Sequence, residues 1–143
     1  MNTCVHEVKT EEEFRKVLPV LQQLRPKLSL EEALSLLERM KEENYRLFSL
    51  YNSEGKVMCL AGTAICTNFY NKKHVFIYDL VTAEAHRSKG HGEKLLSYIE
   101  EWGKENDCSC VVLTSAFLRV DAHRFYEREG YEKVSYSFHK EIK

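Results

Sequence analysis

The order of the predicted elements indicates an α/β (α+β) domain built on a mixed sheet. A strand candidate at 74–82, an amphipathic helix at 90–105 and a strand candidate at 110–115 follow one another, as in a β-α-β unit with parallel strands. Two earlier apolar runs flank the turn NSEG (52–55), as in an antiparallel hairpin. We therefore expect a mostly antiparallel sheet with a central parallel strand pair and helices on both faces.

The first third of the chain predicts a short strand and two helices. The strand candidate is VHEV (5–8), and Thr10 with Glu13 forms a capping-box signature directly after it. Ser29 and Glu32 repeat that signal at the start of a second helix. Apolar residues follow both signals at helical spacing. They are Phe14, Val17, Leu18 and Leu21 in the first helix, and Leu30, Ala33, Leu34, Leu37 and Met40 in the second.

The second half predicts the centre of the sheet and its closing elements. HVFIYDLVT (74–82) is apolar on both faces, which is typical of a central strand, and Tyr78 is expected in the core on the face opposite Asp79. DAHRFYERE (121–129) predicts a helix with Gly130 as its C′ residue. One or two strands are predicted in 131–142. At 143 residues the chain is long enough to bury an ordinary core, so we expect one domain over 1–143.

Composition excludes several classes of function. The chain is 43% hydrophobic and 30% charged with a net charge of -1, so we expect neither a nucleic-acid nor a membrane partner. No apolar run approaches the roughly 20 residues that span a bilayer, and the start does not read as a signal peptide. The five cysteines lack a disulfide-framework spacing, which favours reduced thiols and a cytoplasmic location.

The segment RSKGHG (87–92) joins the central strand to the following helix and is the first functional candidate. A helix N-terminus exposes unpaired backbone N–H groups, and glycines let a phosphate approach them directly. Arg87 and Lys89 add positive charge at this place. Two interpretations stay open from the hexapeptide alone: a phosphate-binding loop, or a tight turn that needs glycine only for its conformation.

A second motif lies about thirty residues further on, and together the two indicate a family. The pattern [Q/R]xxGx[G/A] is matched by Arg87, Gly90 and Gly92, and AxxFYxxxG[FY] by Ala122, Phe125, Tyr126, Gly130 and Tyr131. From about residue 45 to its end, the chain resembles the GNAT superfamily of acetyl-CoA-dependent N-acetyltransferases. The two leading helices fit the variable substrate-side arm of that family. Arg119 departs from the pattern, since many members have Asn there.

The resemblance implies a role for each of these segments. Backbone amides of the loop would hold the pyrophosphate of coenzyme A, and the edge of the central strand, splayed from its parallel neighbour, would pair with the pantetheine arm. The cofactor-binding residues implied are Leu80, Val81, Arg87, Ser88, Lys89, Gly90, His91 and Gly92. Tyr126 would protonate the departing thiolate, although a tyrosine in this helix can also serve only to pack beside Phe125.

Asp79 is the second catalytic candidate. A carboxylate inside an apolar strand is costly unless it is paired or lies at a strand break. Burial disfavours the charged form of a carboxyl group and makes it a better base towards an ammonium. Two other interpretations stay open: a carboxylate held by backbone amides at a β-bulge, or one that only attracts a cationic amine.

These observations predict an N-acetyltransferase that moves an acetyl group from acetyl-CoA directly to a primary amine. A non-catalytic acyl-CoA binding or sensing module is the alternative. The small single domain favours a small-molecule acceptor, while polyamines, aminoglycosides, amino acids and protein amines all stay open. No metal cofactor is expected. Homodimers are common among such folds, but no motif in this chain indicates one.

Overall fold

In the computed structural model, which describes residues 2–143, the strands lie side by side in chain order. They are β1 (Thr3–Val8), β2 (Tyr45–Asn52), β3 (Val57–Asn68), β4 (Lys72–Thr82) and β5 (Val111–Leu113). The pairs from β1 to β4 are antiparallel, and β4 and β5 are parallel. The predicted mixed, mostly antiparallel sheet is therefore confirmed.

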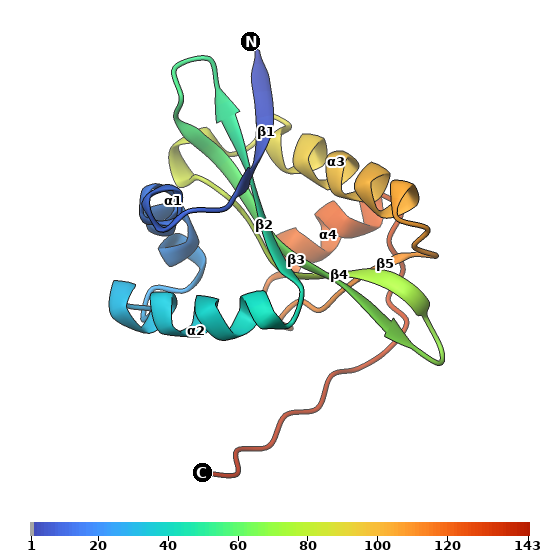
Figure 1. The fold of residues 1–143 in the computed structure, drawn as a ribbon. Coiled ribbons are helices and arrows are strands. Elements are labelled where there is room, and N and C mark those ends of the chain that lie inside the picture. Colours follow the sequence, from blue (N-terminus) through green and yellow to red (C-terminus); the bar gives the residue numbers. More distant parts are fainter. Residues whose placement is uncertain (1) are drawn as a thin grey trace. The chain divides into compact units, whose positions relative to one another are not determined.

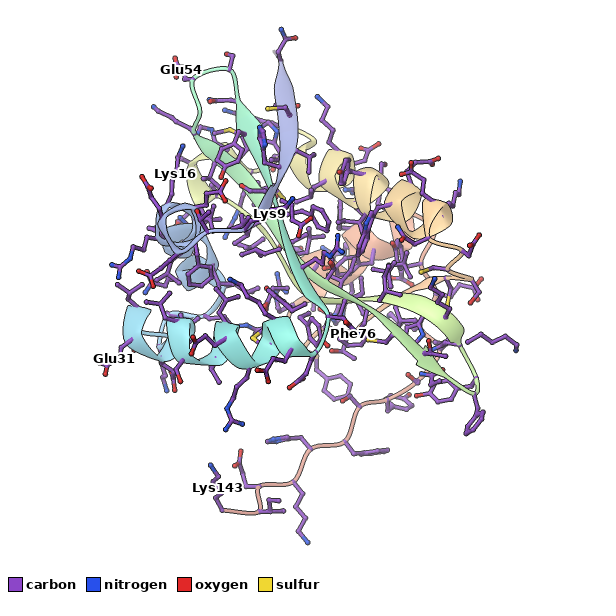
Figure 2. The ribbon with its side chains drawn as sticks, in the orientation of Figure 1. Lys9, Lys16, Glu31, Glu54, Phe76 and Lys143 are labelled. Carbon is purple, nitrogen blue, oxygen red and sulfur yellow. The ribbon has the colours of Figure 1, made fainter. Side chains whose placement is uncertain are left out.

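The helices of residues 1–112 cover both faces of this sheet, as predicted (Figure 1). α1 (Glu11–Leu24) and α2 (Leu30–Glu42) lie on one face, and α3 (His91–Glu105) lies on the other. Both predicted caps form, since the side chains of Thr10 and Ser29 each accept a hydrogen bond of 3.1 Å from the backbone N–H three residues on. Glu31, at the start of α2, points away from the sheet (Figure 2).

The apolar faces of α1 and α2 form the main core with β2, β3 and β4. Val17 and Leu60 are fully buried at its centre. Burying an aliphatic or aromatic side chain contributes about 1.5–3 kcal/mol, so this cluster fixes the two helices on the sheet. The buried members are Phe14, Val17, Leu18, Val20, Leu21, Ala33, Leu37, Leu47, Leu60, Val81 and Ala83.

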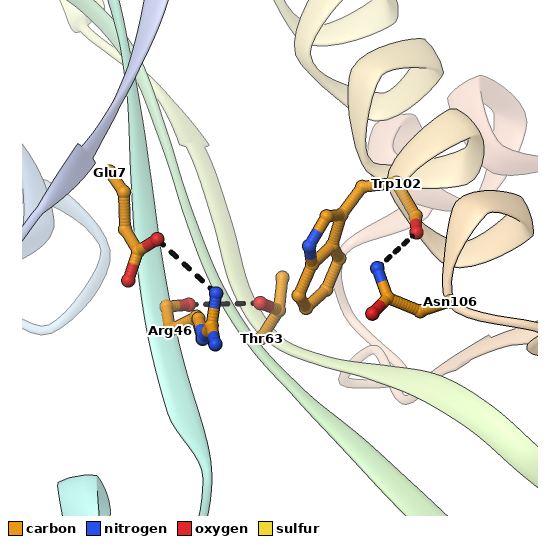
Figure 3. A network of polar contacts seen from close by, with 5 residues as sticks. All are labelled: Glu7, Arg46, Thr63, Trp102 and Asn106. Atoms are coloured by element: carbon orange, nitrogen blue, oxygen red, sulfur yellow. Dashed lines mark hydrogen bonds and ion pairs between the residues drawn. The ribbon is translucent and has the colours of Figure 1, made fainter.

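On the opposite face, α3 packs closely against the sheet. A Cβ added at Gly103 would lie 2.9 Å from Val75 Cγ2, so only glycine permits this approach of helix and strand. Arg46 of β2 is held by Glu7 of β1 and faces the ring of Trp102 on α3 (Figure 3). The Arg46 guanidinium lies 3.4 Å from the Glu7 carboxylate and 6.0 Å from the Trp102 ring. Trp102 also packs edge-on against Phe48, with 5.1 Å between ring centroids.

Residues 113–143 form a second compact unit that contains α4 (Val120–Arg128). Gly130 follows the helix with φ +94°, and the Tyr131 N–H donates to the Tyr126 carbonyl at 2.9 Å, so the predicted glycine C-cap is confirmed. The strands predicted in 131–142 are wrong, because these residues form neither helix nor strand. The alternation of apolar and polar residues there predicts a strand, but strand formation depends on a pairing partner as well as on pattern.

None of the helices within residues 2–143 combines the length and apolar character that crossing a bilayer requires.

Candidate active site

A β-bulge interrupts β4 at Tyr78. Gly62 on β3 pairs with Asp79 and Thr63 pairs with Ile77, which leaves Tyr78 without a partner on β3. Such an extra residue re-aims the side chains beside it. The Tyr78 ring lies 5.8 Å from the Tyr45 ring, which packs against the core under α1 and α2. Tyr78 is 40% exposed, so the prediction that it lies in the core opposite Asp79 is wrong. The reason is that the bulge breaks the alternation of side chains between the two faces of β4.

Asp79 forms an ion pair with Arg25, which stands at the end of α1. Arg25 donates from Nε at 2.9 Å and from Nη2 at 2.6 Å, and both hydrogen bonds reach the same oxygen, Asp79 Oδ1. The Asp79 side chain is 14% exposed and that of Arg25 is 54% exposed. The carboxylate inside the apolar strand is therefore paired with a residue 54 positions away in the sequence.

The position of Arg25 is fixed by the turn between α1 and α2. Its backbone N–H donates to the Leu21 carbonyl at 2.9 Å, and its own carbonyl accepts from the Leu28 N–H at 3.1 Å. The Gln22 side chain also donates to the Leu28 carbonyl, at 2.8 Å. These bonds close the turn and fix the backbone of Arg25, while the two hydrogen bonds to Asp79 direct its guanidinium towards β4.

The Tyr45 ring lies across Gly62, next to Asp79. Burial raises the pKa of the Tyr45 phenol, and the negative charge of Asp79 raises it further. The phenol is therefore neutral at physiological pH. A Cβ added at Gly62 would overlap the Tyr45 hydroxyl and approach the ring carbon Cζ at 2.9 Å. The absence of a side chain at Gly62 therefore sets the place of the Tyr45 ring.

Gly62→Ala is expected to displace the Tyr45 ring and to lower the free energy of unfolding by about 1–3 kcal/mol, as overpacking of a core does. Chemical denaturation measures this cost. The double-mutant cycle with Tyr45→Phe is the control, because removing the hydroxyl relieves part of the overlap. An equal cost of Gly62→Ala with Tyr or Phe at position 45 would contradict the assigned contact.

The first turn of α3, which follows the loop from β4, presents backbone amides that have no carbonyl in the helix to which they could donate a hydrogen bond. Gly90 is the N-cap of α3, with φ +80°, and no side chain within residues 2–143 caps the helix there. The first α3 amide with a helical partner is that of Lys94, which donates to the Gly90 carbonyl at 3.1 Å. The amides of 91–93 are therefore available to an anion.

The same loop is locally positive. Arg87 and Lys89 are exposed within it. Burial lowers the pKa of His91 from its usual value, and the nearby His86 and the Lys94 ammonium lower it further. His91 is therefore mostly uncharged at neutral pH, and its surroundings disfavour a further positive charge. The predicted loop residues Arg87, Ser88, Lys89, Gly90, His91 and Gly92 lie consecutively at this helix N-terminus.

The predicted strand residues Leu80 and Val81 lie between the bulge and this loop. Both side chains are buried, and the backbone pairs with Ala61 and Leu60 of β3 on one side. On the other side, the Val75 N–H donates to the Cys110 carbonyl at 3.0 Å where β5 begins. This bond places the start of β5 beside the first part of β4. Since β5 has only three residues, the end of β4 extends past it.

Tyr126 lies on α4 in the second unit. Its ring is 5.3 Å from that of Phe125 and 6.0 Å from that of Tyr131. The packing beside Phe125 that the sequence allowed is therefore present, and it does not exclude a role for the hydroxyl. Arg119, at the position where the family often has Asn, is the N-cap of α4 and makes no side-chain cap there.

Comparisons with known proteins agree on one family. The sequence model of the Acetyltransferase (GNAT) family matches residues 9–131. The Bacillus subtilis (strain 168) protein called "Uncharacterized N-acetyltransferase YhdJ" is 36% identical over 135 residues, which cover 93% of this chain and 94% of that protein. Aminoalkylphosphonate N-acetyltransferase of Salmonella typhimurium is 35% identical over 66 residues, or 46% of this chain and 43% of that protein.

Solved structures agree in fold. The aminoglycoside N-acetyltransferase AAC(6')-Iy in complex with CoA matches with a TM-score of 0.85, over 99% of this chain and 95% of that one. The two sequences are 14% identical, so this likeness concerns the fold alone.

Proposed function

Because this chain belongs to the GNAT family of acetyltransferases, we propose that it moves the acetyl group of acetyl-CoA directly onto the primary amine of a small molecule. The observation that carries the proposal is the loop at the start of α3. The strand that carries Asp79 is followed by a short 3-10 helix (Glu84–His86), and then by the exposed basic side chains, the left-handed Gly90 and the unpaired amides. A site for an anionic cosubstrate and a candidate base thus belong to one continuous segment of the chain.

The described residues fit coenzyme A at this place. The amides of residues 87–92 would bind the pyrophosphate, with Arg87 and Lys89 adding charge. The backbone of Leu80 and Val81 would pair with the pantetheine arm, because β5 ends before it reaches them. An added Cβ at Gly90 would meet no atom within 4 Å, so the space beside this turn is open.

Acetyl-CoA would supply an activated acetyl thioester, and the chain's own residues would move the protons. An ammonium gives up two protons as it becomes an amide. One would pass through Asp79 to solvent, which leaves the nitrogen lone pair free to form the C–N bond. Tyr126 would donate a proton to the sulfur as the C–S bond breaks. The second proton lost by the nitrogen would balance this transfer, since Tyr126 would then take up a proton again. Holding both reactants in one site would supply much of the rate.

Tyr126→Phe is expected to lower kcat by about a hundredfold with little change in CoA affinity, because it removes the proton donor and keeps the ring. Thiol release measures turnover, and calorimetry with CoA measures binding. Tyr136→Phe, which changes another tyrosine of the second unit, is the control and should leave both values unchanged. Unaltered turnover in Tyr126→Phe would remove its assigned role.

The names of related proteins support a small amine as the acceptor. One relative acts on aminoalkylphosphonates, and a protein of the same fold acts on aminoglycosides.

The five cysteines are free of disulfides, which supports a reducing, cytoplasmic location. The alternative function, an acyl-CoA binding module without catalysis, predicts CoA binding without thiol release. A panel of amines assayed with acetyl-CoA therefore separates the two functions.

A further inference from the structure

We propose that the Arg25–Asp79 pair recognises a zwitterionic acceptor, a primary amine joined by a short carbon chain to a carboxylate or phosphonate group. The inference rests on the proposed acetyl transfer at Asp79 and names the class of its substrate. The ammonium would bind Asp79, and the acidic group would bind Arg25.

Each member of the pair keeps hydrogen-bonding capacity for a ligand. Both hydrogen bonds from Arg25 go to Asp79 Oδ1. Within residues 2–143, no protein group donates to Asp79 Oδ2, and Arg25 Nη1 has no acceptor. A guanidinium carries more N–H groups than the two used here. The pair therefore offers a free acceptor and free donors side by side.

The charge of the pair favours a ligand that carries both signs. The guanidinium already neutralises Asp79, so an amine with no other charge would place a second cation beside Arg25. A zwitterion avoids this repulsion, because its acidic group meets the guanidinium while its ammonium meets the carboxylate. Arg is also the side chain best suited to bind a planar carboxylate or a phosphonate through two parallel hydrogen bonds.

Burial orders the two ends of such a ligand. Asp79 is the deeper member, with 14% of its side chain exposed, and Arg25 is the outer one, with 54% exposed. The acidic group would therefore bind towards solvent and the nitrogen towards the strand. The turn fixes the backbone of Arg25 and the hydrogen bonds to Asp79 order its side chain, which lowers the entropic cost of recognition.

The test compares matched acceptors with the full-length protein and acetyl-CoA. β-Alanine and 2-aminoethylphosphonate are the zwitterions, propylamine is the matched amine without an acid, and spermidine is the polyamine. We expect kcat/KM for at least one zwitterion to exceed that for propylamine by about tenfold or more, as one charge-assisted interaction provides. The better of the two zwitterions identifies the acidic group.

The ratio of kcat/KM for the zwitterion to that for propylamine then tests Arg25 itself. Arg25→Gln is expected to reduce this ratio to near one. Arg15→Gln is the matched control, since Arg15 lies on the same helix, pairs with Glu11 at 3.0 Å and is 51% exposed. It should leave the ratio unchanged. If Arg25→Gln does not fold, the ratio of the unaltered protein still decides.

Three results would overturn the inference, and they are distinguishable. Equal or better use of propylamine or spermidine by the unaltered protein would reject the zwitterion while acetyl transfer stands. Failure to release thiol with any amine, despite CoA binding, would reject acetyl transfer and the inference with it. A ratio that Arg25→Gln leaves intact would also reject the role of Arg25.

Discussion

Gly92→Glu is expected to abolish measurable CoA binding while the fold is kept. Gly92 is the second residue of α3, in the turn whose amides are free of helical partners. A carboxylate there would repel the negative pyrophosphate and occupy the amides that are proposed to bind it. The helix itself tolerates the change, because Glu is a good helix former and is favoured in a first turn. Calorimetry with CoA measures the loss.

Ser97→Glu is the matched control, because it adds the same charge to an exposed position further along α3. It should bind CoA as the unaltered chain does. His91 gives a second readout in the same titration, since a bound anion should raise its lowered pKa and thereby strengthen binding as the pH falls. Retained affinity in Gly92→Glu would disprove the phosphate-binding role of the loop.

Much of the fold could be predicted because its signals are local. Thr10 with Glu13 and Ser29 with Glu32 place side chain and backbone within one helical turn, so a capping pattern suffices. The hairpin and the glycine after α4 depend on turns of a few residues. The loop at the start of α3 is local in the same sense, since its glycines and charges are adjacent in sequence.

The surroundings of Asp79, where we propose that the acceptor binds, could not be predicted in the same way. Arg25 meets Asp79 across 54 positions, and no spacing in the sequence marks that contact. The bulge at Tyr78 depends on the register in which β3 and β4 pair. A prediction from simple alternation along the sequence therefore placed Tyr78 on the wrong face. A close approach such as that of Tyr45 to Gly62 also becomes visible only once two strands are paired.

Asp79→Asn is expected to lower kcat by about a hundredfold to a thousandfold, because it removes the proposed proton acceptor. The substitution keeps the size of the side chain and an oxygen that can still accept from Arg25, so the turn between α1 and α2 should stay in place. Initial rates of thiol release at saturating acetyl-CoA measure the effect. CoA affinity, measured separately, should change little, because the amides that are proposed to bind the pyrophosphate are not altered.

Glu7→Gln provides the matched control for Asp79→Asn, since Glu7 is another half-buried carboxylate paired with an arginine, at 3.4 Å from Arg46. If losing an ion pair were enough to slow the enzyme, both variants would be slow. If Asp79 accepts the proton of the ammonium, Asp79→Asn alone is slow, and raising the pH should restore part of its rate because more of the amine is then neutral without a base. A slow variant with no such recovery would indicate that Asp79 holds the ammonium without accepting its proton.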